Sequence, residues 1–159
     1  MSGRQPSVTE RQKKLRAVLD TNVPIAAHLS KNPDSPTAEL LRRWKDKEFI
    51  QLYSSETLDE LNRKFVEKEI DPQIAAEYIA HLVESGIYVE VGPGDIEPVI
   101  PADPDDDLIV ACAVVGGATH IVTYDPHFEV LGEEHKGIEI VDGLTFLHRV
   151  RGDELPERS

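Results

Sequence analysis

The chain has 159 residues, with 30 acidic side chains against 17 basic ones and a net charge of −13 at neutral pH. This length allows one domain with a single hydrophobic core and is too short for two. The acidic balance opposes non-specific binding of nucleic acid, so a nucleic-acid enzyme of this composition needs metal ions or a local basic surface at its site.

The sequence pattern also argues against membrane and secretory classes. The longest run of small and apolar residues, 108–118, is shorter than the ~20 residues that a membrane-spanning helix needs. The polar N-terminus lacks the apolar segment of a secretory signal. The single cysteine, Cys112, excludes an intramolecular disulfide and a zinc site built from cysteines, and it fits a reducing compartment. We therefore expect a cytoplasmic protein with no membrane partner.

Capping residues and apolar runs define the elements of the N-terminal half. Asp-Thr-Asn at 20–22 ends a short apolar run, and Ser35-Pro36 is typical of a helix start. In chain order we predict a flexible arm at 1–14, a strand at 15–19, a helix at 23–29, a helix at 36–47, a strand at 49–53, a helix from Ser54 or Ser55 to about residue 69, and a helix between Asp71-Pro72 and Gly86.

Glycine and proline punctuate the C-terminal half. The connection at 92–104 is too rich in both for a regular element and is a candidate rim of a site. We predict a strand at 87–91, a buried helix that follows Asp105 to Asp107 and stops at Gly116-Gly117, a strand at 120–123, a turn at Asp125-Pro126 with a short helical piece, a strand at 138–141, a helix near 143–150 and a polar tail at 151–159.

The alternation of strands and helices predicts the fold class. It indicates a parallel sheet with helices on both faces. We expect an α/β, three-layer α/β/α sandwich whose central sheet is mostly parallel and five-stranded, formed by residues 15–150. In such sheets ligands bind outside the carboxyl ends of the strands, which is where chemistry is expected.

Acidic residues from four strand-to-helix connections gather at that edge. They are Asp20 after the first strand, Glu60 in the helix after the second, Asp103, Asp105, Asp106 and Asp107 before the helix after the third, and Asp125 after the fourth. Taken alone, each has a structural explanation as a helix cap, a turn residue or part of a solvated face. Together, converging carboxylates repel one another, and a bound cation removes that penalty.

Hard oxygen ligands select Mg²⁺ or Mn²⁺ rather than zinc. A pair of such ions can activate water and stabilise the leaving oxygen of a phosphodiester. His127 lies close to Asp125 and is either a substrate contact or an ordinary surface histidine. No spacing suggests a serine or cysteine nucleophile with a matched histidine.

Competing motifs fail at particular positions. An EF-hand loop starting at Asp103 needs glycine and glutamate where Leu108 and Val114 stand. A haloacid-dehalogenase-type phosphatase needs a second aspartate at the position of Asn22. A P-loop is absent from the sequence. A receiver-like signalling domain needs paired acids after the first strand and a lysine after its last catalytic strand, and neither is found.

The chain resembles the PIN-domain family (PilT N-terminus-like). The resemblance covers residues 15–149, and the closest members look like PIN toxin components of type II toxin–antitoxin systems. The matching segments are VLDTNV (18–23), SSETLDEL (54–61), DPDDDLIVACAVVGGATHIVTYD (103–125) and IEIVDG (138–143).

The resemblance implies site residues position by position. The four family acids fall on Asp20, Glu60, Asp106 and Asp125, which it implies to be catalytic and metal-binding. Asp105 and Asp107 are the alternative occupants of the third position, and the supporting polar residues fall on Thr21, Asn22 and Thr123. The family commonly has glycine where Tyr124 stands, a departure that bears on the turn holding Asp125.

The implied activity is Mg²⁺- or Mn²⁺-dependent hydrolysis of RNA by the toxin of a type II toxin–antitoxin pair. The implied partners are an RNA substrate, an antitoxin protein and a second copy in a homodimer. The alternatives are an RNA-processing or flap-type nuclease outside a toxin system, and a catalytically silent PIN-like RNA-binding or interaction module.

Overall fold

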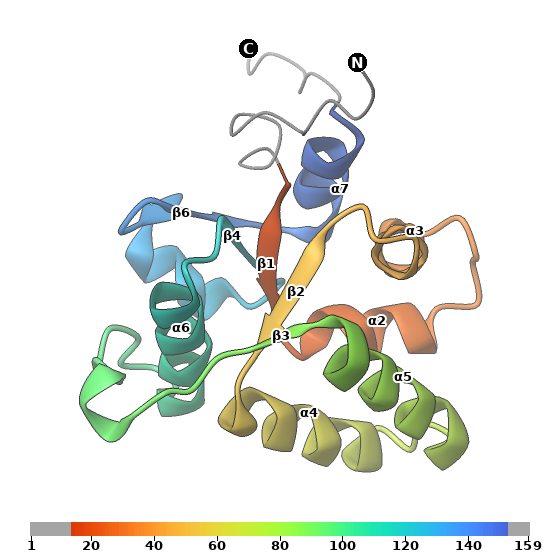
Figure 1. Cartoon of the computed structure of the whole chain (residues 1–159), viewed down its shortest axis with the longest axis horizontal. Helices are drawn as coiled ribbons and strands as arrows, with labels where there is room; N and C mark the ends of the chain where they lie inside the picture. Colours follow the sequence, from red (N-terminus) through yellow and green to blue (C-terminus); the bar gives the residue numbers. More distant parts are fainter. Residues whose placement is uncertain (1–13, 153–159) are drawn as a thin grey trace, which may run out of the picture.

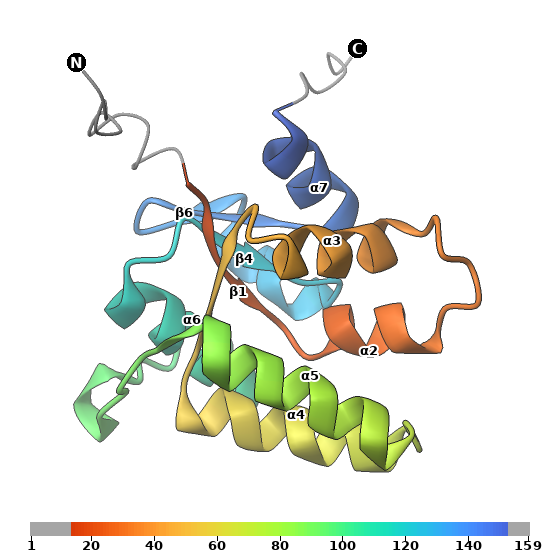
Figure 2. The same cartoon turned by 45° about the vertical axis from the view of Figure 1, so that its right-hand side comes forward.

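The computed structural model describes residues 14–152, which form a central sheet with helices on both faces (Figures 1 and 2). The strand order is β3-β2-β1-β4-β6-β5, and every neighbouring pair is parallel except β5 with β6. The strands are β1 (Arg16–Leu19), β2 (Ile50–Tyr53), β3 (Ile87–Tyr88), β4 (His120–Val122), β5 (Glu134–His135) and β6 (Ile138–Val141). The predicted α/β sandwich with a mostly parallel sheet is confirmed, with one strand more than expected.

Local capping chemistry sets the helix ends. Ser54 and Thr57 cap α4 reciprocally, since each accepts a hydrogen bond from the backbone N–H of the other. Gly117 ends α6 with a φ of 65°, a left-handed conformation that favours glycine. The helices are α2 (Asn22–Leu29), α3 (Pro36–Lys45), α4 (Ser55–Glu67), α5 (Pro72–Ser85), α6 (Pro104–Gly116) and α7 (Gly143–Arg151), with 3-10 turns η1 (Pro93–Asp95) and η2 (Pro126–Leu131).

The sheet separates two hydrophobic cores. Successive side chains of a strand point to opposite faces, so Ala17 and Leu19 of β1 enter one core and Val18 enters the other. The first core lies against α2, α3, α4, α5 and α7, and the second lies against α6 and η2 (Figures 1 and 2). Strands buried on both faces explain the nearly continuous apolar runs in the sequence.

The additional strand, β5, forms an antiparallel hairpin with β6 at the edge of the sheet. Lys136 and Gly137 make the two-residue turn, and both have positive φ values, 51° and 82°. Positive φ at both turn positions matches the right-handed twist of the flanking strands. The sequence pattern missed this strand because it has only two residues and its turn has lysine rather than asparagine or aspartate before glycine.

The carboxyl ends of β1 and β4 lie side by side. Leu19 pairs with Val122, and the backbone N–H of Asp20 donates to the Val122 carbonyl at 2.9 Å. The residues that follow these two strands are therefore neighbours, although about 100 positions separate them in the chain.

Within residues 14–152, no helix combines the length and apolarity needed to cross a lipid bilayer. The predicted arm at 1–14 lies outside the described residues except for Lys14, and the predicted tail lies outside them beyond Gly152. Both remain predictions.

Candidate metal centre

Three aspartates converge at the carboxyl edge of the sheet. Asp20 follows β1, Asp106 lies in the first turn of α6, and Asp125 follows β4. One carboxylate oxygen from each lies within 4.8 Å of the corresponding oxygens of the other two. The structure thus brings together three of the four predicted catalytic acids.

Asp20 is buried and held by several donors. Its Oδ2 accepts hydrogen bonds from the Thr123 hydroxyl at 2.7 Å and from the Asn22 amide at 3.3 Å. Its Oδ1 accepts from the Thr21 backbone N–H at 2.8 Å. The helix that follows has no side-chain cap hydrogen bond, so capping does not explain this aspartate.

The aspartates at the start of α6 have different roles: Asp103 precedes the helix, and Asp105 to Asp107 lie in its first turn. Asp103 caps the helix, accepting from the Asp105 backbone N–H at 2.9 Å. Asp105 is exposed at the rim, whereas Asp106 is buried in the triad. Asp107 is also buried, but its Oδ1 accepts from the backbone N–H groups of residues 99 and 100, at 3.0 and 2.8 Å. Among the three alternatives left by the sequence, only Asp106 lies in the triad.

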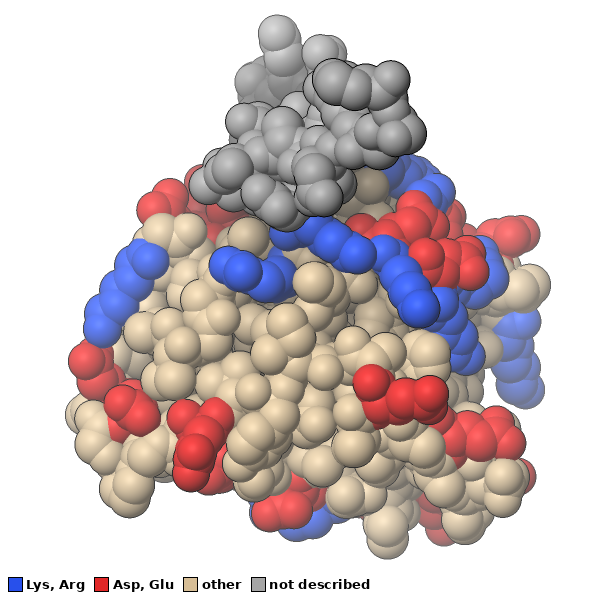
Figure 3. Space-filling view, viewed as in Figure 1, with Lys and Arg blue, Asp and Glu red and all other residues tan. Residues whose placement is uncertain are grey.

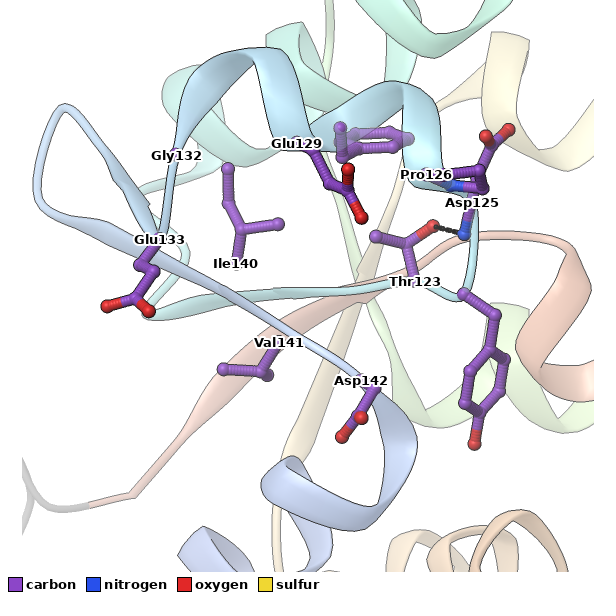
Figure 4. Close-up of a pocket in the computed structure, with 11 residues that line it drawn as sticks. Thr123, Asp125, Pro126, Glu129, Gly132, Glu133, Ile140, Val141 and Asp142 are labelled. Atoms are coloured by element: carbon purple, nitrogen blue, oxygen red, sulfur yellow. Dashed lines mark hydrogen bonds between the residues drawn. The ribbon is translucent and has the colours of Figure 1, made fainter. Parts of the chain in front are cut away.

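The turn after β4 is held by two polar side chains, Thr123 after β4 and Asn22 after β1. The Thr123 hydroxyl accepts from the Asp125 backbone N–H at 3.0 Å, and the Asn22 side chain accepts from the Tyr124 backbone N–H at 3.2 Å. Figure 4 shows the first of these bonds and the Asp125 carboxylate beyond it. Tyrosine at the common glycine position is thus accommodated without removing Asp125 from the triad.

Glu60 lies beside the triad but outside it. It lines the same cavity of about 410 Å³, and its carboxylate pairs with Arg63 one turn further along α4. The cavity is lined by Asp20, Thr21, Asn22, Ile25, Ala26, Leu29, Glu60, Lys64, Lys68, Asp103, Asp105, Asp106, Ile109 and Asp125. Glu60 is therefore placed to contact a ligand of this cavity rather than to complete the aspartate cluster.

Two lysines of this cavity were not predicted from the sequence. Lys64 follows Glu60 by four residues on one face of α4, and Lys68, which caps the end of that helix, follows by four more, so all three line the cavity. The four-residue spacing from Glu60 is the sequence feature that could have predicted these two lysines at the site. Other basic residues stand at the end of α3 and before β2, at the opposite, amino edge of the sheet: Arg42, Arg43, Lys45 and Lys47. Lys and Arg side chains gather in the upper half of the face in Figure 3.

His127 lies beside the acids of the site rather than on an unrelated part of the surface, and its contact with substrate stays a prediction. Its Nδ1 lies 3.4 Å from Asp106 Oδ2 and 3.3 Å from Asp125 Oδ1. With Asp103 and Asp106 it forms a second group whose ligand atoms lie within 4.8 Å of one another. The imidazole is about two-fifths exposed, at 43% of its side-chain surface, and can meet a ligand from solvent.

The electrostatics of the triad favour a bound cation. Burial raises the pKa of Asp20, and the nearby Asp125 and Glu60 raise it further, against the lowering effect of the Thr123 and Thr21 hydrogen bonds. Burial and the charges of Asp20 and Asp125 raise the pKa of Asp106 to about 7. These acids resist ionisation because their negative charges are crowded and shielded from water.

A hard divalent cation fits this donor set. The three converging ligands are carboxylate oxygens, and two of the aspartates are buried. Mg²⁺ and Mn²⁺ prefer such oxygen ligands, and a positive ion would offset the repulsion among the acids. Asp20, Asp106 and Asp125 are the residues placed to hold it.

The family model for the PIN domain matches residues 16–127, more than half of the chain. This chain belongs to the PIN-domain family. The match includes all three aspartates of the triad together with Glu60 and both lysines of the cavity. PIN domains are typically nucleases and generally use divalent metals, as the acidic cluster here leads one to expect.

The fold of this PIN domain is also similar to a solved structure. The crystal structure of PAE2754 from Pyrobaculum aerophilum superposes with a TM-score of 0.57, covering 89% of this chain and 92% of that chain, at 16% sequence identity. At this identity the likeness concerns the fold alone. A sequence comparison with curated proteins finds no match.

Proposed function

We propose that this PIN domain is a metal-dependent endoribonuclease that acts in the cytoplasm as the toxin of a type II toxin–antitoxin pair. The observation that carries the nuclease proposal is the triad of Asp20, Asp106 and Asp125, whose oxygens lie within 4.8 Å of one another. Three separate connections of the fold supply these acids. Such an arrangement costs stability unless a cation is bound, so a binding function explains it better than a structural one.

Different residues of the site have different roles in phosphodiester hydrolysis. The aspartate triad holds Mg²⁺ or Mn²⁺, which when bound activates water and stabilises charge on the leaving oxygen. Thr123 and the Thr21 backbone N–H orient Asp20 through their hydrogen bonds. Glu60, which lines the cavity, positions the attacking water or adds a ligand.

Cationic side chains bring the RNA to this acidic site. Lys64 and Lys68 line the cavity on the α4 side and attract the phosphates that flank the cleaved bond. His127 is placed between two of the acids and solvent, where it can hydrogen-bond a phosphate oxygen or the leaving group.

The toxin role, the antitoxin and the homodimer rest on the resemblance of the chain, including the DPDDD segment at 103–107, to PIN toxins. A toxin requires a neighbouring antitoxin gene and growth arrest on induction. Induction of wild type should stop growth, and induction of Asp20→Asn should not. Normal growth on induction of an active nuclease would instead favour an RNA-processing role.

Cleavage of a panel of single-stranded RNAs tests the nuclease proposal. We expect cutting with Mg²⁺ or Mn²⁺, none with EDTA, and a loss of more than about 100-fold in the Asp20→Asn variant. Asp34→Asn, the same change at an exposed position away from the cavity, is the matched control and should keep wild-type activity. If the folded protein binds RNA but cuts none with either metal, the proposal of a nuclease is wrong and the chain is a catalytically silent binding module.

A further inference from the structure

A second cavity lies on the other side of Asp125 from the acidic cluster. Its volume is about 450 Å³, and its walls come from the turn after β4, from η2, and from β6 with the residue that follows it. Asp125 lines both cavities, and Figure 4 shows its carboxylate pointing away from this second one. A nucleotide next to the cleaved phosphodiester is therefore within reach of it.

The lining of this cavity suits a flat, largely apolar ligand. Phe128 is buried beneath it, and Ile140 and Val141 add aliphatic surface. Tyr124, an aromatic residue that is 44% exposed, lines the same cavity. Aromatic side chains beside unpaired bases are a general means of binding single-stranded nucleic acid.

Tyr124 is held in place by its surroundings. Its backbone N–H donates to the Asn22 side chain, and the backbone N–H of Gly143 hydrogen-bonds its hydroxyl group. A Cβ atom on Gly143 would meet the Tyr124 hydroxyl oxygen, so the present position of this hydroxyl depends on glycine at residue 143. The ring therefore offers a contact surface that is positioned before the ligand arrives.

Charge excludes a phosphate from this cavity. Its ionisable lining residues other than Tyr124 are all acidic: Asp125, Glu129, Glu133 and Asp142. The carboxylate of Glu129 points into the cavity between Ile140 and Thr123, whereas that of Glu133 points away from it (Figure 4). Within residues 14–152, no hydrogen bond or ion pair engages the Glu129 carboxylate, which leaves both of its oxygens available to N–H donors of a ligand.

We propose that this cavity receives an unpaired guanine base next to the cleaved phosphodiester, with Glu129 as the residue that selects it. This inference rests on the proposed ribonuclease function. Guanine presents two adjacent donors, N1–H and the N2 amino group, which match the two oxygens of one carboxylate. Uracil flanks its single N–H with carbonyl oxygens that repel a carboxylate, and adenine and cytosine place an acceptor beside their amino groups.

Binding of free nucleosides tests the subsite without involving the acidic cluster, because a nucleoside carries no phosphate. In metal-free protein, titration with guanosine should shift the NMR signals of Phe128 and Ile140, and uridine should shift them about tenfold less at equal concentration. The Glu129→Gln variant should lose this preference. Glu134→Gln, the same change at an exposed residue that does not line the cavity, should keep it. Equal shifts with both nucleosides, or none, would overturn the subsite.

Cleavage of RNA oligonucleotides with a single guanine at successive positions gives the second readout. Wild type should cut next to that guanine about tenfold faster than next to uracil, and Glu129→Gln should lower only the guanine rate. Metal-dependent cutting without a guanine preference would overturn the subsite and leave the nuclease proposal intact. Guanosine binding without any cutting of RNA would support the subsite and overturn the nuclease proposal.

Discussion

At the scale of the residue, burial and capping separate side chains that are chemically identical. Asp103, Asp105, Asp106 and Asp107 stand within five positions, yet one caps a helix, one faces solvent, one joins the triad and one holds a neighbouring segment. The helix turns by about 100° per residue, so adjacent positions meet different surroundings. Function at this site therefore depends on one position of the run.

The two neighbouring aspartates Asp105 and Asp106 give a paired prediction. Asp106→Asn removes a charged oxygen from the triad and should lower the rate of RNA cleavage by more than about 100-fold. Asp105→Asn makes the same chemical change at the exposed rim and should change the rate by only a few-fold. Single-turnover cleavage rates measured at saturating metal would check this. A larger loss in Asp105→Asn than in Asp106→Asn would move the third ligand to Asp105.

Thr123 is predicted to act by positioning. Its hydroxyl donates to Asp20 and accepts from the Asp125 backbone N–H. Thr123→Val therefore removes the acceptor of the Asp125 N–H and the shorter of the two hydrogen bonds to Asp20 Oδ2. We expect a loss of cleavage of about 10–100-fold and weaker metal binding by calorimetry. Thr123→Ser retains the hydroxyl and should keep most of the cleavage activity and most of the metal affinity. If valine and serine are equally impaired, the role of the residue is packing rather than hydrogen bonding.

At the scale of the element, the irregular connection between β3 and α6 is held by a side chain of the helix itself. Asp107 accepts from two backbone N–H groups of this connection, at residues 99 and 100, and Ile100 is buried in the second core. The glycines and prolines that made the segment look like a loop also prevent it from satisfying these groups in a sheet.

Asp107→Ala should therefore lower the free energy of unfolding by about 1–3 kcal/mol, because it leaves the buried Ile100 N–H without an acceptor. Asp107→Asn keeps one side-chain oxygen and should cost less. Urea denaturation of both variants measures the difference. Equal stability of the alanine variant and wild type would show that water replaces the carboxylate.

The lysines of α4 give a second prediction at this scale. Lys64 and Lys68 are the basic residues placed on the acidic cavity, so the Lys64→Gln/Lys68→Gln pair should weaken RNA binding. The slope of log affinity against log salt should fall by about 0.7 for each lost phosphate contact. Binding is measured in the Asp20→Asn background, which prevents cutting. Lys45→Gln/Lys47→Gln, at the amino edge of the sheet, is the matched control and should leave the slope unchanged.

At the scale of the whole molecule, the fold keeps like charges close together at one edge of its sheet. The raised pKa of Asp106, about 7 against an ordinary value of 3.8, is one sign of this cost. A folded-state pKa above the unfolded value means that the stability from this group is fully present below pH 3.8 and is lost as pH rises through about 7. The metal-free protein should thus be weakest at this site in neutral to alkaline solution.

Thermal unfolding at about pH 5 and about pH 8 tests this linkage. Mg²⁺ or Mn²⁺ should raise the melting temperature more at the higher pH, because the ligands must lose their protons to bind the ion. At a metal concentration 100 times the dissociation constant, binding adds about 2.7 kcal/mol to the free energy of unfolding. In EDTA at pH 8, Asp106→Asn should melt above wild type. A metal-induced shift of equal size at both pH values would contradict the assignment.

Local patterns in the sequence predicted the order of the α-helices and of every strand except β5, together with the edge at which the acids gather. Apolar periodicity and capping are local properties, and parallel strands bring their carboxyl ends to one edge whatever the residues between them. The positions of Asp20 and Asp125 at the site therefore follow from the amino-acid sequence alone.

Distances between residues that are remote in the sequence depend on tertiary packing, and local patterns did not predict them. Tertiary packing placed Asp106 rather than Asp105 or Asp107 in the triad, brought His127 against two of the acids, and left Glu60 beside the cluster. These outcomes follow from how α6, η2 and α4 pack on the sheet. A local pattern tells which face a residue occupies, whereas the packing of whole elements sets whether two carboxylates lie within reach of one ion.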